Sequence, residues 1–102
     1  MTNVFAAVSD PTRREILQRL KDSGPLSLKE IAKSLPMTRQ AVTKHLDILC
    51  QAGLVRSRRR GRERLLELDA TPLRQVEEWL EPYSAFWDDA LARLERHLEE
   101  KP

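Results

Sequence analysis

The sequence predicts a mainly α-helical fold that contains one small β-hairpin. Three observations favour this fold class. Apolar residues recur at steps of three and four along most of the 102 residues, as they do on one face of a helix. Good N-cap residues precede several of these segments. Only residues 54–68 change character, and they form two short runs around Gly61, which is typical of a hairpin.

The charge of the chain is unevenly distributed, although the net charge is only +2. Residues 38–66 hold eight basic and two acidic side chains, a local charge of +6. Residues 67–102 hold four basic and ten acidic side chains, a local charge of −6. One part of the chain should therefore attract a polyanion, and the other part should repel it.

Composition argues against several classes of protein. No apolar run is long enough to cross a bilayer, and residues 1–11 do not resemble a secretory leader, so we expect a cytoplasmic protein without a membrane partner. A single cysteine, Cys50, rules out an intrachain disulfide. Neither a metal-binding spacing of Cys and His nor a catalytic arrangement is visible. We therefore expect no metal, no cofactor and no enzymatic activity.

The first two helices are indicated by their ends. Residues 2–8 form a weakly amphipathic segment, which must pack on something to be ordered. Asp10 is a good N-cap and Pro11 suits the first helical position, so a second helix should run from Pro11 to about Asp22 and stop at Gly24. In that helix we expect Ile16, Leu17 and Leu20 to face inward and Arg13, Arg14, Glu15 and Lys21 to face outward.

Two further helices are expected between residues 27 and 53. Ser27 and Glu30 have the spacing of a capping box, which starts a helix at Leu28. Pro36 should end that helix, and Thr38 should cap the next one, which should close at Gly53. Two short helices joined by a tight turn form a helix-turn-helix.

The second of these helices, residues 38–51, has two different faces. Its apolar residues should point into the core, and its outer face carries side chains of the types that contact base edges in DNA. The alternative is an ordinary solvated face. The expected inward residues are Val42, Leu46 and Leu49, and the candidate DNA-binding residues are Thr38, Arg39, Gln40, Thr43 and Lys44.

An arginine-rich hairpin, residues 54–68, follows directly, and we call it the wing. Leu66 and Leu68 should face the core and alternate with outward Leu65 and Glu67. Guanidinium groups on such a hairpin can lie along phosphates or in the minor groove. The alternative is a solvated hairpin without a nucleic-acid partner. The candidate DNA-binding arginines of the wing are Arg58, Arg59, Arg60, Arg62 and Arg64.

The last helix should begin after Thr71 as its cap and extend for about 28 residues, with Pro82 either kinking or splitting it. Its heptad-like apolar stripe, widened by Trp79 and Phe86, is too long for this domain to cover alone. We expect a second copy to cover it, and the alternative is a helix folded back on its own domain. The predicted dimer interface comprises Val4, Phe5, Val8, Leu73, Val76, Leu80, Tyr83, Trp87, Leu91, Leu94 and Leu98.

Taken together, these motifs resemble the ArsR family of winged-helix transcriptional regulators over residues 4–70. The acidic tail, with Trp79-Leu80-Glu81-Pro82-Tyr83 and Phe86-Trp87, resembles a subgroup of that family without a metal site. Metal-sensing members carry a Cys-x-Cys motif on the recognition helix, where this chain has only Cys50. The motifs that carry the resemblance are Asp10-Pro11-Thr12-Arg13-Arg14-Glu15-Ile16-Leu17, Ser27-Leu28-x-Glu30-Ile31-Ala32, Gln40-Ala41-Val42-Thr43-Lys44-His45-Leu46-x-x-Leu49 and Ala52-Gly53-Leu54-Val55.

The resemblance implies a homodimeric repressor that binds a double-stranded operator, expected to be an inverted repeat. It implies a single winged-helix domain over residues 1–102, with the helix-turn-helix and wing in residues 10–70 and dimerisation helices in residues 1–9 and 71–102. The helix at 38–51 would enter the major groove, and the wing would touch the backbone or minor groove. The alternative function is a winged-helix interaction module whose basic face binds an acidic protein.

Three side-chain types invite a second interpretation. His45 is expected to be a packed, hydrogen-bonded structural residue, with a ligand role as the alternative. Cys50 is expected to be a small buried apolar residue, since a redox switch needs an exposed thiolate of low pKa. The tryptophans and Tyr83 are interpreted as interface core, with an apolar pocket for an unknown small-molecule effector as the alternative.

Overall fold

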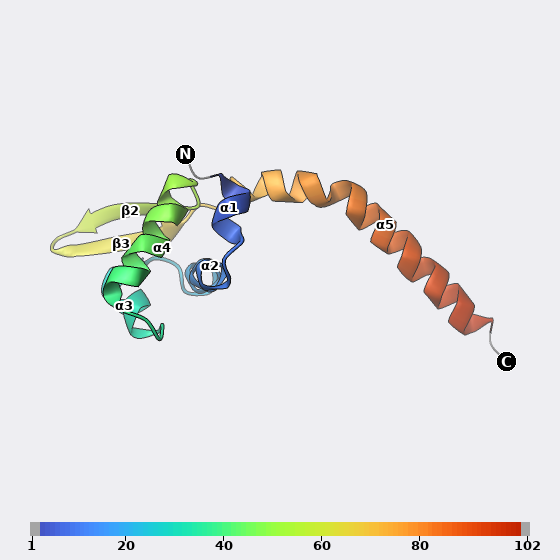
Figure 1. Ribbon diagram of the computed structural model, residues 1–102, viewed down its shortest axis with the longest axis horizontal. Coiled ribbons are helices and arrows are strands. Elements are labelled where there is room, and N and C mark those ends of the chain that lie inside the picture. The colour runs from blue at the N-terminus through green and yellow to red at the C-terminus, as the bar shows by residue number, and fades with distance from the viewer. Residues whose placement is uncertain (1–2, 101–102) are drawn as a thin grey trace.

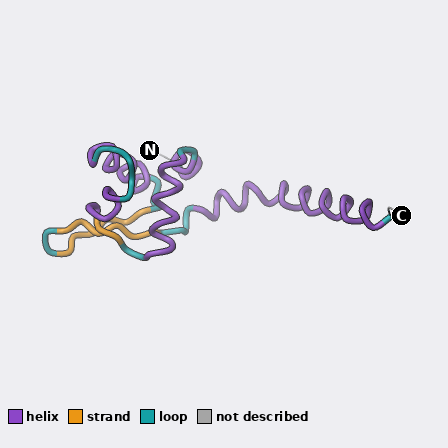
Figure 2. The backbone as a smooth tube through the Cα atoms, turned by 90° about the horizontal axis from the view of Figure 1, so that it is seen from below, coloured by secondary structure: helices purple, strands orange, loops and turns teal. Residues whose placement is uncertain are grey.

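The computed structural model describes residues 3–100 and confirms the mainly helical fold with a small hairpin (Figure 1). A compact helical body carries the hairpin on one side and a long helix on the other, and the two project in opposite directions (Figures 1 and 2). The elements are α1 (Val4–Val8), α2 (Pro11–Ser23), β1 (Leu26–Ser27), α3 (Leu28–Lys33), α4 (Arg39–Gln51), β2 (Val55–Arg60), β3 (Glu63–Leu68) and α5 (Leu73–Glu99).

The core lies among α1 to α4 and one side of the sheet. The inward residues predicted for α2 and α4 are all buried there, and Leu54 and Leu66 bring the hairpin into the same cluster. Full burial of one such side chain is worth about 1.5–3 kcal/mol. This core fixes the position of α4 and of the base of the wing. Its largest fully buried side chains are Ile16, Leu20, Ile31, Val42, Leu46, Leu49, Leu54 and Leu66.

The predicted N-caps of the central helices are confirmed. The Asp10 carboxylate accepts from the amide of Arg13 at 3.0 Å. Ser27 and Glu30 form the reciprocal capping box, with N···O distances of 3.1 and 3.2 Å. The Thr38 hydroxyl accepts from the amide three residues on. Each cap satisfies an amide that the first turn of a helix leaves without a partner.

The end of α4 is fixed by Gly53, as predicted. Gly53 has φ +78°, in the left-handed region that glycine adopts without strain. Its amide donates to the Cys50 carbonyl, and the amide of Leu54 donates to the Leu49 carbonyl, both at 3.0 Å. This is a Schellman arrangement, and it turns the chain directly from α4 into β2.

The sheet contains three antiparallel strands in the order β1-β3-β2. The two-residue strand β1 was not predicted, because Ser27 also caps α3 and the cap was the stronger local signal. The prediction that Leu65 faces outward was wrong. Leu65 is 7% exposed and Leu66 is fully buried, because β3 is the central strand and at Leu65 it is flanked by Ser27 and Arg58.

Two predicted boundaries also need correction. Helix α3 ends at Lys33, before Pro36, because the Ser34 hydroxyl donates to the Ile31 carbonyl at 2.7 Å and tightens the last turn. Thr71 does not cap α5. The cap position is Pro72, which has no side-chain hydrogen bond, and the Thr71 amide instead donates to Asp69 at 3.1 Å.

The question left open at Pro82 is answered by α5. The helix is continuous from Leu73 to Glu99, with Pro82 inside it, and it changes direction along its length (Figure 1). It is therefore one bent rod and not two helices. Among the described residues, no helix is both long and apolar enough to span a membrane.

Candidate nucleic-acid interface

The outer face of α4 presents a small set of available polar groups. Arg39, Gln40 and Lys44 are exposed, and within residues 3–100 neither Arg39 nor Lys44 makes an ion pair. Both threonine hydroxyls among the predicted DNA-binding residues of this segment are already engaged. Thr38 caps the helix, and Thr43 donates to the Arg39 carbonyl at 3.0 Å. The long side chains therefore remain as the main hydrogen-bonding groups of this face.

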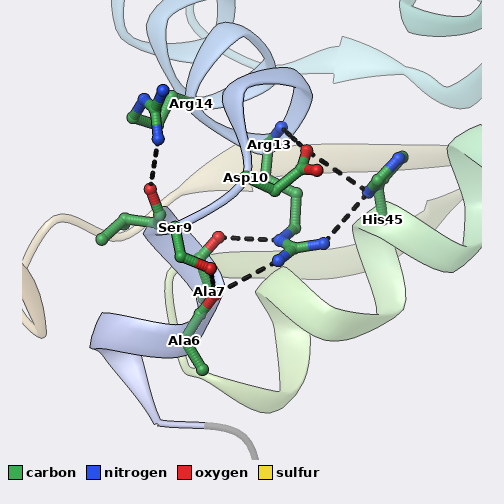
Figure 3. A network of polar contacts seen from close by, with 8 residues as sticks. Ala6, Ala7, Ser9, Asp10, Arg13, Arg14 and His45 are labelled. Atoms are coloured by element: carbon green, nitrogen blue, oxygen red, sulfur yellow. Dashed lines mark hydrogen bonds and ion pairs between the residues drawn. The ribbon is translucent and has the colours of Figure 1, made fainter.

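The prediction that Arg13 points outward was wrong. Its side chain connects α2 to α1 and α4 (Figure 3). Its guanidinium donates to the carbonyls of Ala7 at 2.7 Å and Ala6 at 3.2 Å. It also donates to Nδ1 of His45 on α4 at 3.3 Å. The Ala7 carbonyl at the end of α1 has no partner within the helix, and Arg13 supplies one, whereas the Ala6 carbonyl also accepts from the amide and hydroxyl of Ser9. Arg13 thereby ties α1 and α2 to α4.

His45 is half-buried and hydrogen-bonded, in agreement with a structural role. Its Nδ1 lies 3.9 Å from the Asp10 carboxylate. The pKa of Asp10 is lowered mainly by the hydrogen bond from the Arg13 amide, with the positive charge of Arg13 and the nearby His45 adding to the effect. Asp10 is thus kept ionised where α2 meets α4.

The two sides of the wing differ in their charge. Strand pairing places Ser57 and Arg59 of β2 on the same side as Arg64 of β3 and buried Leu66, and we call Ser57, Arg59 and Arg64 the inner wing face. The alternate residues Arg56, Arg58 and Arg60 form the outer wing face.

Several wing arginines are neutralised by nearby carboxylates. Arg56 pairs with Asp69 at 3.0 Å and Arg58 with Glu67 at 4.0 Å. The hydrogen bonds from Thr71 and Arg56 lower the pKa of Asp69 from 3.8 to about 2. Within the described residues, Arg59, Arg60 and Arg62 make no ion pair. The five predicted wing arginines are therefore not equivalent.

Arg64 connects the wing to α4. Its Nε donates to the Ser57 hydroxyl at 2.6 Å, and its Nη2 lies 3.5 Å from the Asp47 carboxylate on α4. Neither contact was predicted, because Asp47 and Arg64 are close only once the hairpin has folded beside α4. This bridge fixes the direction in which the inner wing face points.

Cys50 packs against the core as predicted, but it is half-buried and not fully buried. Burial raises the pKa of its thiol, and this outweighs the opposite effect of Arg64. A thiol of raised pKa is a poor redox sensor. Among the described residues, no group of three or more His, Cys, Asp and Glu side chains could hold a metal.

The apolar residues of α5 remain largely uncovered. No residue of α5 is buried. Phe5 of α1 meets Trp79 edge-on, with ring centroids 6.2 Å apart, and Trp79 contacts Tyr83 at 5.3 Å. Beyond these contacts the helix leaves the body of the molecule (Figure 1). The exposed large apolar side chains of α5 are Trp79, Tyr83, Phe86, Trp87, Leu91, Leu94 and Leu98, which we call the apolar stripe.

Four residues of the predicted dimer interface, Val4, Val8, Leu73 and Val76, already pack in or against the core of their own domain. Val4 is 3% exposed and lies in the core, so it has almost no surface left for a partner. Leu73 and Val76 are half-buried against the same core. Val4 is therefore removed from the expected interface, and the remaining positions form its accessible part.

A helix-turn-helix followed by an arginine-rich hairpin defines the winged-helix class of DNA-binding proteins. Residues 8–58 match the family described as "Helix-turn-helix domain". The chain is 42% identical to an HTH-type transcriptional regulator of Mycobacterium tuberculosis, over 85% of this chain and 78% of the relative. It is 38% identical to the transcriptional repressor SdpR of Bacillus subtilis, over 78% and 88%.

Solved structures give the same result. An ArsR-like transcriptional regulator from Rhodococcus sp. RHA1 is 39% identical and superimposes with a TM-score of 0.72, over 97% of this chain and 90% of that chain. The chain belongs to the ArsR family of winged helix-turn-helix regulators. It is a DNA-binding transcriptional regulator.

Proposed function

We propose that the protein is a homodimeric repressor that recognises an inverted-repeat operator in the cytoplasm, where the DNA is. The observation that carries the proposal is the unpaired basic surface shared by α4 and the wing. Arg39 and Lys44 on α4 and Arg62 at the tip of the wing have no ion-pair partner among residues 3–100. The name of the relative SdpR supports repression as the direction of regulation.

In this proposal α4 lies in the major groove. Arg39 and Gln40 read base edges, because a guanidinium pairs with guanine and an amide with adenine. Lys44 contacts base edges or the adjacent phosphate, and Thr43 offers its methyl group to a thymine, since its hydroxyl is engaged within the helix. The wing holds the neighbouring backbone and fixes the register of α4 on the duplex.

The second copy packs along α5. A helix of 27 residues extends for about 40 Å, and the apolar stripe follows its length without cover. Charge supports a like partner: the acidic residues lie mainly off the stripe, so two copies meet through apolar surface and not through facing carboxylates. Dimerisation then presents two copies of α4 to two half-sites.

The test is a DNA-binding titration of the purified full-length protein. The region upstream of its own gene is compared with random DNA of equal length at 50 and 200 mM salt. If six to ten phosphates are contacted, affinity should fall by about 10³–10⁵ between these salt concentrations. A clear preference for the upstream region supports a self-regulating repressor. Equal, salt-steep binding to both DNAs contradicts sequence reading and favours the interaction-module alternative.

A further inference from the structure

We infer that one DNA phosphate is held on the inner wing face, between Arg59 and Arg64, and that the outer wing face contributes no equivalent contact. This inference rests on the proposed function and names the residues that grip the backbone. It differs from the sequence-based expectation, in which five arginines of the wing contribute alike.

The first argument comes from strand register. Arg59 of β2 lies directly opposite Arg64 of β3. Like charges directly opposite each other on one face of a sheet are destabilising. The outer wing face shows the opposite arrangement: Arg56 is opposite Glu67, and Arg60 is opposite Glu63. Within the two strands, carboxylates therefore lie opposite arginines on the outer face and not on the inner face, where Arg64 is compensated only from α4, by Asp47.

The second argument is the shape of this surface. A hollow of about 320 Å³ is lined by Ser57, Arg58, Arg59, Arg62 and Arg64, and no carboxylate contributes to its lining. Arg58 belongs to the outer wing face and is paired with Glu67, so the guanidinium groups available in the planar, forked geometry that matches a phosphate are those of Arg59, Arg62 and Arg64. An anion in this hollow would remove the repulsion between Arg59 and Arg64.

The third argument is preorganisation. The Nε of Arg64 is held by Ser57, and its Nη2 lies beside Asp47 of α4. Arg64 therefore has its direction fixed before DNA arrives, which reduces the entropy lost on binding. Arg59 keeps its own donors unpaired, since it has no ion-pair partner among the described residues.

The position of the hollow explains what the phosphate would do. A second hollow, of about 240 Å³, has Arg62 and Arg64 in common with the first and reaches Arg39 at the start of α4. A backbone held at Arg59 and Arg64 would continue past Arg62 toward the base-reading end of α4. The phosphate contact thus sets the register of the recognition helix, which is the usual role of backbone contacts.

The experiment compares Arg59→Gln with Arg56→Gln in the full-length protein. Both variants lose one positive charge from β2, but only Arg59 lies on the inner face. Binding is measured on the preferred DNA and on random DNA across a salt series. For Arg59→Gln we expect weaker binding to every sequence, by about tenfold to a hundredfold. The slope of log affinity against log salt should fall by about 0.9 per protomer. For Arg56→Gln the slope should match the wild type.

Thermal unfolding of the free protein supplies the second readout. Arg59→Gln removes a like-charge pair, so its melting temperature should equal or exceed that of the wild type, which separates a lost DNA contact from a damaged fold. Arg59→Lys should retain the salt slope, because the charge stays, while losing part of the affinity, because the fork is lost.

The outcomes distinguish the two proposals. Salt-steep binding by the wild type with equal slopes for Arg59→Gln and Arg56→Gln overturns the inner-face phosphate and leaves the repressor proposal intact. A lowered melting temperature for Arg59→Gln also contradicts the inference. A wild-type protein without salt-steep DNA binding overturns the repressor proposal, and the phosphate contact with it.

Discussion

The wing and α5 extend from opposite sides of the same body (Figure 1), and they leave different groups without partners. On the wing and α4 the unpaired groups are guanidinium and ammonium ions, and on α5 they are aromatic and leucine side chains. The first set suits a polyanion, and the second suits another apolar surface. The acidic residues of α5 would repel the DNA backbone. The difference shows how a chain with a net charge of +2 can have two surfaces of separate specificity.

The largest effect is expected when the apolar stripe of α5 is made polar, because this removes the surface proposed for dimerisation. Leu91→Glu combined with Leu94→Glu places two carboxylates in the apolar stripe, and we expect a monomer in analytical ultracentrifugation. Affinity for the operator should fall by about 10²–10⁴, because the two half-sites are no longer bound together. Asp88→Asn, on the polar side of α5, serves as the control and should leave the dimer unchanged. A stable dimer in the double variant would contradict the role of the stripe.

The role of α4 in base recognition is tested by Arg39→Ala. Loss of a base contact should reduce discrimination between operator and random DNA by about 1–3 kcal/mol, while affinity for random DNA changes less. Arg93→Ala removes the same charge from α5 and should leave the ratio unchanged. Competition titrations with the two DNAs measure it. An unchanged ratio in Arg39→Ala would place base reading elsewhere on α4.

The body between the two ends is tested by Arg13→Ala. The substitution leaves the Ala7 carbonyl without its donor and removes the bonds from Arg13 to Ala6 and His45, so the free energy of unfolding should fall by about 1–3 kcal/mol. Arg14→Ala removes a single exposed bond, to the Val8 carbonyl at 2.8 Å, and should cost less. Urea unfolding monitored by circular dichroism compares the two. Equal losses would mean that the Arg13 network adds no more than one surface hydrogen bond.

The smallest expected effect is on acid stability. The pKa values of Asp10 and Asp69 are lowered in the folded protein, that of Asp69 to about 2. Both carboxylates therefore stabilise the fold above the unfolded value of about 4, and this stabilisation is lost as the pH falls toward 2. Asp69→Asn should flatten the decline in melting temperature between pH 5 and 2. An identical pH profile in this variant would contradict the role of Asp69.

Local signals in the sequence predicted most of the fold. Asp10-Pro11, the Ser27–Glu30 pair, Thr38 and Gly53 each fix a helix end through atoms within a few residues, so the sequence alone shows them. Strand β1 and the burial of Leu65 depend on pairing between residues about 40 positions apart, which no local pattern records.

The candidate site was predictable in its residue types and not in its internal contacts. The exposed basic residues of α4 follow from helical periodicity. The turn of Arg13 toward α1 and the bridge from Arg64 to Asp47 arise only after packing. The sequence does not show which arginines form ion pairs after folding, so it could not distinguish the paired Arg64 from Arg59.

Helix α1 has only five residues, yet it is connected both to the proposed recognition helix α4 and to the long helix α5. Through Arg13 it is joined to α4, and through Phe5 it meets Trp79 of α5. In a dimer built along α5, the distance between the two α4 helices would therefore depend on how α1 packs between α4 and α5. The preferred spacing of operator half-sites would then depend on how α1 packs, at residues outside the proposed DNA contacts. Changes at Phe5 would be expected to select operators of a different length rather than of a different sequence.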